Sequence, residues 1–315
     1  MNSIWTMGEM LVEIMRPGVD MEHDQTGVYA GPYASGAPAI FIDTVARLGI
    51  PSGIFGGVGE DGFGKLILDR LEKDGVDCRN VIRSDSGSTA VAFVMYRNDG
   101  SRNFIFHIGN TPAVQVLAPV KVPAVNPSFF HVMGCSLTIN DSFRQEIIKT
   151  MELFLAAGAG ICFDPNIRPE LLGGKGLRAV IDPVMKNCSI LMPGVEELLL
   201  ISGQDEIGLA VATLFENPKL EIIALKKGKN GCSIYTRGER FDFGVYEVTP
   251  VDPTGAGDCF DGAFLVGLVQ GKSIGDCARM ATAAASLNTA VRGPMEGQIS
   301  AGSLMEMISQ NRVTR

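Results

Sequence analysis

Histidine is scarce in this sequence, and its scarcity excludes one class of metal site. Only His23, His107 and His131 occur, far apart along 315 residues, so a histidine-based zinc site is not expected. Cysteine pairs are missing as well. The seven cysteines are odd in number and form no Cys-x-x-Cys motif, which argues against a disulfide framework and indicates a reducing compartment.

Long apolar runs are also lacking. No stretch is apolar enough over about 20 residues to cross a bilayer. The first apolar stretch has no basic segment before it and is interrupted by Glu9 and Glu13, so it predicts a first β-strand rather than a signal peptide. We therefore expect a soluble protein of the cytoplasm with no membrane partner.

The charge balance disfavours nucleic acid as a partner. The formal net charge is −8, and an acidic surface repels phosphate backbones. Hydrophobic residues make up 46% and charged residues 20%, which is typical of a globular protein. No low-complexity linker or internal repeat divides the chain, so we expect a single domain over residues 1–315.

Apolar runs with strand character alternate with amphipathic helical stretches along most of the chain, as in Ser52–Val58 followed by Phe63–Lys73. This alternation predicts a Rossmann-like α/β fold, in which helices cover both faces of a parallel sheet and ligands bind at the carboxyl ends of its strands. A hairpin pattern within residues 88–112 breaks the alternation. We expect it to form a β-lid over the site together with residues 12–34.

Residues 252–264, DPTGAGDCFDGAF, carry the strongest chemical signal. The small residues Gly255, Ala256 and Gly257 let the backbone approach a ligand closely. A helix is expected to start there, so its free N–H groups and positive dipole end would form an anion hole suited to phosphate. Asp258 stands at the same point, where it can accept the proton of a hydroxyl group that attacks a phosphoryl group.

A helix cap is the alternative interpretation, because Asp is a favoured cap and Gly a favoured turn residue. The full stretch, however, resembles the second signature of the ribokinase-like (PfkB) carbohydrate kinase family. Residues 35–49 resemble its first signature, and residues 58–64 resemble its next loop. Residues 163–169 are similar to a segment typical of fructokinases and 2-keto-3-deoxygluconate kinases. The resemblance covers nearly the whole chain and favours a kinase over a cap.

The resemblance implies a ribokinase-like three-layer α/β/α fold with a small β-lid. It also implies a sugar held beneath the lid, ATP across the C-terminal half and Mg²⁺ on the phosphates. Lids of this family sometimes pair, so a homodimer through the lid is a further expectation. A monovalent cation such as K⁺ often lies behind the family's anion hole, at positions that match Asp252, Thr254 and Gly293.

Together, the residues and the resemblance predict the members of the site. The catalytic set is Asp258, Gly255, Ala256 and Gly257. The sugar is expected to contact Glu13, Gly36, Ala37, His107, Asn166, Arg168 and Asp258. The nucleotide is expected at Lys226, Gly228, Gly231, Gly257 and Thr254, with Glu197 as a Mg²⁺ ligand. For Lys226, a role as a strand cap is as well supported as a phosphate contact. For Glu13, an exposed position at a strand end is as well supported as a sugar contact.

Two positions depart from the family pattern. Ile40 replaces an Asn that contacts sugar hydroxyls, and Gly194 replaces the Asn of an Asn-x-x-Glu motif whose carboxylate Glu197 keeps. The Asp-Pro-Asn-x-Arg segment at 164–168 suggests a ketose or a keto-acid. Since residues 106–108 offer no arginine from the lid, and an unpartnered carboxylate is costly to bury, a neutral ketohexose such as fructose or tagatose is favoured over 2-keto-3-deoxygluconate.

Two interpretations from other classes compete with the kinase. Residues 57–62 satisfy the Gly-x-Gly-x-x-Gly pattern of dinucleotide-binding dehydrogenases, but Glu60 and Asp61 would place negative charge beside the pyrophosphate. A structural or substrate-side loop is therefore favoured there. A catalytically silent sugar-binding regulator is the second alternative, and Ile40 and Gly194 are the departures that support it.

Overall fold

The computed structural model describes residues 2–123, 126–167, 176–310 and 312–313. Within them, nine strands form one large sheet in the order β13-β12-β11-β10-β9-β8-β1-β4-β5. Pairing is parallel from β11 to β5, and β12 and β13 add an antiparallel edge. The strands are β1 (Ser3–Met7), β4 (Ser52–Gly59), β5 (Val81–Ser84), β8 (Pro127–Met133), β9 (Gly160–Asp164), β10 (Cys188–Leu191), β11 (Ile222–Lys226), β12 (Cys232–Thr236) and β13 (Arg240–Phe243).

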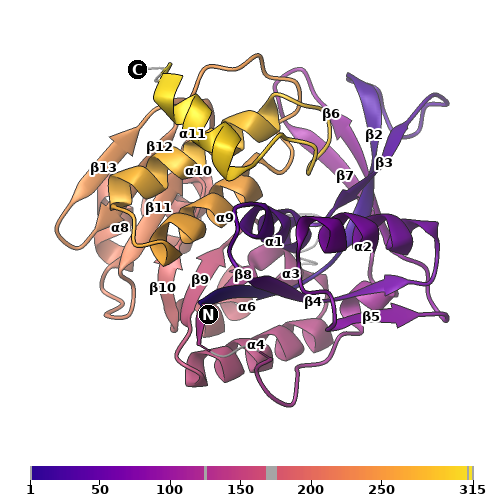
Figure 1. The fold of residues 1–315 in the computed structure, drawn as a ribbon, viewed down its shortest axis with the longest axis horizontal. Helices are drawn as coiled ribbons and strands as arrows, with labels where there is room; N and C mark the ends of the chain where they lie inside the picture. The colour runs from indigo at the N-terminus through magenta and orange to yellow at the C-terminus, as the bar shows by residue number, and fades with distance from the viewer. Residues whose placement is uncertain (1, 124–125, 168–175, 311, 314–315) are drawn as a thin grey trace.

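Helices cover both faces of this sheet, which confirms the predicted three-layer α/β/α fold (Figure 1). Ile4 and Ile54 belong to one hydrophobic core and their neighbours Trp5 and Phe55 to the other, because successive strand residues face opposite sides. One face carries α1 (Ala37–Arg47), α2 (Gly62–Asp74), α9 (Ala256–Val269), α10 (Ile274–Thr289) and α11 (Ala301–Gln310). The other carries α3 (Gly134–Ile139), α4 (Asp141–Ala156), α6 (Leu177–Met185), α7 (Val195–Ser202) and α8 (Ile207–Leu214). Two 3₁₀ turns are η1 (Pro112–Val114) and η2 (Gly228–Asn230).

A second sheet, which we call the lid sheet, stands apart from the large one (Figure 1). Its strand order is β3-β2-β6-β7. The β2–β6 pair is parallel, and the other two pairs are antiparallel. The strands are β2 (Leu11–Val19), β3 (Ala30–Ser35), β6 (Ala90–Tyr96) and β7 (Arg102–His107), so the sheet is built from the two segments expected to form the lid.

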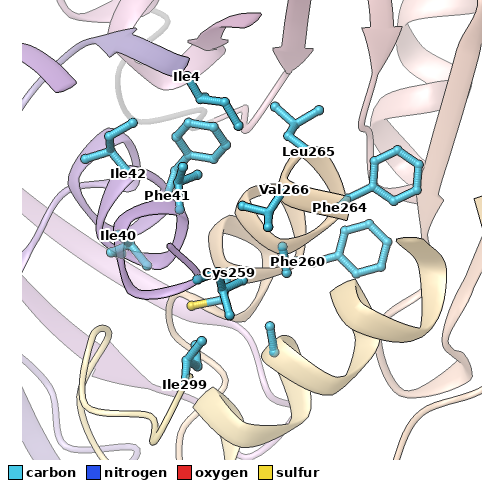
Figure 2. Close-up of a cluster of buried hydrophobic side chains, with 14 of the residues drawn as sticks. Ile4, Ile40, Phe41, Ile42, Cys259, Phe260, Phe264, Leu265, Val266 and Ile299 are labelled. Atoms are coloured by element: carbon cyan, nitrogen blue, oxygen red, sulfur yellow. The ribbon is translucent and has the colours of Figure 1, made fainter. Parts of the chain in front are cut away.

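The placement of α9 depends on close packing against α1. Figure 2 shows Phe41 of α1 beside Leu265 and Val266 of α9, within one buried apolar cluster. Gly262 permits this approach, because a Cβ atom there would lie 2.9 Å from the Phe41 carbonyl oxygen and 3.1 Å from the Thr44 Cβ. The packing fixes α9 against the sheet, and with it the position of the helix N-terminus.

The cysteines and the helices agree with the absences noted in the sequence. All seven cysteines are free thiols and buried, which suits their role as small apolar side chains. In the part of the chain that the structure describes, none of the helices has both the length and the apolar character needed to cross a membrane.

The close contact of α1 with α9 gives a first prediction. Gly262→Val should lower the free energy of unfolding by about 2 kcal/mol, because the added methyl groups overpack the helix contact. Gly208→Ala is the matched control. Gly208 lies in α8, where a Cβ atom would meet no other atom within 4 Å, so stability should stay equal or rise slightly. Urea unfolding measures both, and equal stability of the two variants would contradict the packing argument.

Candidate active site

One cavity of about 770 Å³ lies between the lid sheet and the carboxyl ends of the parallel strands. Strand β9 ends at Asp164 and strand β11 ends at Lys226, and both residues line the cavity. Ligands of such sheets bind at this edge. The predicted site residues that line the cavity are Glu13, Gly36, Ala37, Asn166, Glu197, Lys226, Gly228, Thr254, Gly255, Gly257 and Asp258.

The start of α9 forms one wall of the cavity. Gly255 has a φ of 80°, in the left-handed region, and a Cβ atom there would clash with the Pro294 carbonyl oxygen. Only glycine therefore fits at this turn. The helix begins at Ala256, so the amides of its first turn lack partners within the helix and carry the positive end of its dipole. This local geometry suits an anion such as phosphate.

Asp258 lies in that first turn, buried and facing the cavity. The Asn166 side chain donates to the Asp258 Oδ1 atom over 3.1 Å. Asn166 has a φ of 39°, in the left-handed region, and its backbone N–H donates to Asp164 Oδ1 over 3.1 Å. The Asp-Pro-Asn turn after β9 therefore holds the amide that orients the Asp258 carboxylate.

Lys226 is tied to two buried carboxyl groups. Its Nζ lies 2.7 Å from Asp164 Oδ2 and 3.1 Å from Asp261 Oδ2. Burial alone would lower the pKa of Lys226, but the two acidic side chains outweigh it and raise that pKa. Burial and the neighbouring Asp164 raise the pKa of Asp261, while Lys226 keeps the pKa of Asp164 below its ordinary value. The two acidic side chains therefore keep the lysine charged.

Glu197 is fixed at the N-terminus of α7. Its Oε2 accepts from the Gly194 N–H over 2.7 Å, and its Oε1 accepts from the Ile167 N–H over 2.8 Å. Burial and the nearby Asp164 raise the pKa of this carboxyl group. Gly194 caps α7 with its backbone alone, so the loss of Asn at this position leaves the Glu197 carboxylate in place.

The lid sheet places a second acid at the opposite end of the cavity. Glu13 Oε1 accepts from the Ser35 hydroxyl over 2.8 Å, whereas its buried Oε2 has no hydrogen-bond partner among the described residues. Burial raises the pKa of Glu13 to about 7. Glu13 is therefore buried in the site, and the exposed strand end considered from the sequence is wrong.

The expected contact at His107 is not supported by the position of its side chain. Exposure alternates along β7, and His107 faces outward, where its ring meets Phe93 edge-on. The cavity is lined instead by Arg102, Phe104 and Phe106 of the same strand. The sequence pattern predicted a lid arginine only after the aromatic residues, at 106–108, and so did not indicate Arg102. Period-2 alternation nevertheless puts positions 102, 104 and 106 on one face of the strand.

The positions expected around a monovalent cation come together behind the anion hole. Asp252 accepts from the Thr254 N–H through Oδ1 (2.9 Å) and from the Gly293 N–H through Oδ2 (3.0 Å). Asn288, which the sequence argument did not single out, donates its Nδ2 to the Thr254 carbonyl over 2.7 Å. The Asn288 Oδ1 is buried without a partner among the described residues. An orphaned buried oxygen of this kind fits a cation ligand.

Besides His107, four predicted positions do not line the cavity. Ala256 lies between two residues that do, while Asp252, Gly231 and Gly293 lie outside its lining. Arg168 falls outside the described residues. Among the described residues, no cluster of three or more His, Cys, Asp or Glu side chains could hold a metal ion by itself. A divalent cation would therefore need oxygen ligands from a bound phosphate as well as from Glu197.

The second glycine-rich segment is structural. A Cβ atom at Gly57 would clash with the Pro112 carbonyl oxygen, and one at Gly59 would clash with the Gly87 carbonyl oxygen. Asp61 caps α2, and its side chain accepts from the Phe63 and Gly64 N–H groups. The space beside Gly57 and Gly59 is filled by neighbouring backbone, and the start of α2 is capped by Asp61. The segment therefore has no open turn in which a pyrophosphate could bind.

A phosphate-sized anion hole, a buried carboxylate beside it and a charged lysine at the same edge define a phosphotransferase site on an α/β/α fold. The pfkB family carbohydrate kinase model matches residues 2–300. Fructokinase-1 of Oryza sativa subsp. japonica is 32% identical over 275 residues, which cover 85% of this chain and 83% of the relative. The chain belongs to the pfkB family of carbohydrate kinases.

Solved structures agree with this assignment. A provisionally named ribokinase II from E. coli, in complex with ATP and Mg²⁺, superposes with a TM-score of 0.90 at 38% identity, covering 99% of this chain and 100% of that one. A fructokinase from Vibrio cholerae O395 with fructose, ADP and calcium ion shares the fold at a TM-score of 0.83 and 22% identity, covering 98% and 99% of the two chains. The predicted family, fold and enzyme class are confirmed, and the dehydrogenase alternative is excluded.

The buried Glu13 carboxyl group predicts a stability that depends on pH. Burial raises the pKa of Glu13 from its ordinary value of 4.5 to about 7. The unfolded state therefore loses this proton at a lower pH than the folded state. As a result, the free energy of unfolding of the wild type falls as the pH rises from 4.5 to about 7. Glu13→Gln removes that cost. Its stability relative to wild type should rise by about 3 kcal/mol between pH 4 and pH 8, measured by urea unfolding. A difference that does not change with pH would contradict the burial of this carboxyl group.

Proposed function

We propose that this sugar kinase transfers the γ-phosphoryl group of ATP to a hydroxyl group of a ketohexose such as fructose or tagatose. The observation that carries the proposal is the position of Asp258, buried in the first turn of α9 at the point where the lid half and the nucleotide half of the cavity meet. Relatives named fructokinases support the sugar, and the E. coli structure with ATP and Mg²⁺ supports the phosphoryl donor.

In the proposed reaction, the attacking hydroxyl oxygen forms a bond to the γ-phosphorus as the bond from that phosphorus to the leaving ADP oxygen breaks. Asp258 accepts the hydroxyl proton, and Asn166 holds its carboxylate in place through the 3.1 Å hydrogen bond. The amides from Gly255 to Gly257 stabilise the charge that develops on the transferred group. The start of α9 thus supplies both the base and the charge stabilisation.

Lys226 supplies positive charge beside the anion hole. Its Nζ lies 3.7 Å from the position a Cβ atom would take on Gly257. The ammonium group donates to Asp164 and to both carboxyl oxygens of Asp261, which hold its charge at this edge of the cavity. The strand-cap alternative for Lys226 is less favoured, since a cap does not require two buried acidic partners.

The nucleotide would lie over the N-terminal end of α7 and the turn after β11. Val195 and Leu200 offer apolar surface there, and Lys227 and Gly228 complete the lining. Glu197 is the carboxylate that would hold Mg²⁺, which neutralises charge on the nucleotide phosphates when bound. Asp252, Thr254, Gly293 and Asn288 would hold K⁺ behind the anion hole.

The charges at the lid end favour a neutral sugar. Glu9, Glu13 and Asp258 line this part of the cavity, and Arg102 is the only cationic side chain that the described residues of the lid sheet contribute to it. The attraction of Arg102 lowers the pKa of Glu13, against the larger effect of burial. Arg102 is the one observation that favours 2-keto-3-deoxygluconate, but a sugar carboxylate would share it with these acids.

The cytoplasmic location and the pairing of two lids stay predictions. Ile105 and His107 lie on the outer face of β7, where Ile105 is 42% exposed. A second lid would meet this outer face rather than the cavity.

A substrate screen tests the proposed function. ADP release is measured with ATP and Mg²⁺ over fructose, tagatose, ribose, glucose and 2-keto-3-deoxygluconate, with NMR of the product to locate the phosphate ester. We expect the highest kcat/KM with a neutral ketohexose. Saturable binding of a sugar without ADP release would support the regulatory alternative, and preference for the sugar acid would overturn the neutral assignment.

The role of Asp258 gives a sharper prediction. Asp258→Asn keeps the shape of the side chain but removes the proton acceptor, so kcat should fall by about 10²- to 10⁴-fold while sugar affinity, measured by calorimetry, changes little. Asp69→Asn, at an exposed position of α2, is the control and should keep wild-type turnover. Turnover of Asp258→Asn within a few-fold of wild type would refute the assignment.

A further inference from the structure

The lid sheet makes polar contact with the core at a point that the proposed chemistry does not use. Tyr96 ends strand β6, and its hydroxyl group reaches the turn that precedes the anion hole. It donates to Asp252 Oδ1 over 2.9 Å and lies 2.8 Å from the Thr254 Oγ1. One lid side chain therefore contacts two residues of the turn that leads directly into Gly255.

The core holds the same turn from its other side. The Gly293 N–H donates to Asp252 Oδ2, and the Asn288 side chain donates to the Thr254 carbonyl. Within the turn, the Thr254 N–H donates to the same Asp252 oxygen that accepts from Tyr96. The core also holds the turn through the Asp252 N–H, which donates to the Thr289 carbonyl over 3.0 Å. The turn is thus held by the core on one side and by the lid on the other.

The Tyr96 hydroxyl can make both contacts at once. It donates its one proton to Asp252 Oδ1, and its oxygen can accept from the Thr254 hydroxyl. Arg102 approaches the same Thr254 hydroxyl at 3.4 Å, and Glu13 lies on the neighbouring lid strand. Neither of these charged groups replaces the Tyr96 contact with Asp252.

We propose that Tyr96 is a positioning residue, which orders the anion hole when the lid lies against the core. Its hydroxyl fixes the Asp252–Thr254 turn, and the turn sets the direction of the Gly255–Gly257 amides that receive the transferred phosphoryl group. The inference rests on the proposed function and adds to it a link between lid position and the phosphate end of the site. Tyr96 acts through Asp252 and Thr254 and does not touch the reacting atoms.

Tyr96→Phe tests the link, because it keeps the ring and removes only the hydroxyl group. We expect kcat to fall about 10- to 100-fold, while the KM for sugar changes by less than about 3-fold, since misplaced charge stabilisation acts on the transition state. Tyr29→Phe is the matched control. Its hydroxyl also lies in the lid region but contacts His23 at 3.2 Å, away from the cavity lining, so turnover should match wild type.

A double variant separates positioning from simple loss of stability. If Tyr96 acts through Thr254, then Tyr96→Phe with Thr254→Val should cost no more in kcat than the larger single effect. Additive losses would overturn the proposal, and so would an unchanged kcat in Tyr96→Phe. A raised sugar KM with normal kcat would assign Tyr96 to sugar binding instead and would also overturn it.

A second measurement does not depend on turnover. Amide hydrogen exchange of the free protein should be faster over residues 254–258 in Tyr96→Phe than in Tyr29→Phe, because the turn has lost its lid contact. Equal exchange in the two variants would overturn the proposal even if the enzyme phosphorylates sugars. Faster exchange in a protein that phosphorylates no sugar would support the Tyr96 contact while refuting the proposed function.

Discussion

The left-handed turn at Gly255, pressed against the Pro294 carbonyl, is the constraint on which the rest of the site depends. It brings the start of α9 to the edge of the sheet, where backbone amides can meet a phosphate without a side chain in between. Gly262 serves the same end from within the helix, since it lets α9 pack directly on α1. Neither glycine has a side chain, so the α9 backbone can lie close to the Pro294 carbonyl at Gly255 and to the Phe41 carbonyl at Gly262. These two contacts set the position of the anion hole.

The charges of the site follow from that placement. An acidic protein must receive an anionic nucleotide, and Lys226 and Lys227 both line the cavity. The charge of Lys226 is partly balanced by Asp164 and Asp261. Burial lowers the pKa of Lys226, but the two acids outweigh this effect and raise it, so the lysine stays charged. At the other end, Glu13 is buried with one oxygen that no described residue contacts by a hydrogen bond, which suits a sugar hydroxyl as a donor. Lys226 thus presents a cation beside the anion hole, and Glu13 presents a hydrogen-bond acceptor on the lid side of the cavity.

Local patterns predicted the α/β alternation, and the family resemblance was needed to choose a kinase site over a helix cap at residues 252–264. The glycines and Asp258 lie together in the sequence, and the two hairpin strands of the lid, β6 and β7, fall within the expected residues 88–112. Side chains that act through distant partners could not be found in this way, because neither the carboxyl partners of Lys226 nor the Tyr96 contact with Asp252 has a local pattern. The face of His107 was also beyond the sequence: alternation places neighbouring residues on opposite faces but does not say which face meets the cavity.

The lid sheet contributes to both ends of the cavity through adjacent strands. Glu13 on β2 lines the cavity with a buried oxygen that no described residue contacts by a hydrogen bond, and Tyr96 on β6 donates to the turn before the anion hole. Since β2 and β6 are paired in register, with Glu13 opposite Ala92, a displacement that moves Glu13 away from the sugar must also move Tyr96 away from Asp252. A hydrogen-bonded sheet cannot easily change one distance without the other. In the proposed complex, the pairing of β2 with β6 would therefore couple the position of Glu13 at the sugar to the position of Tyr96 at the turn before the anion hole.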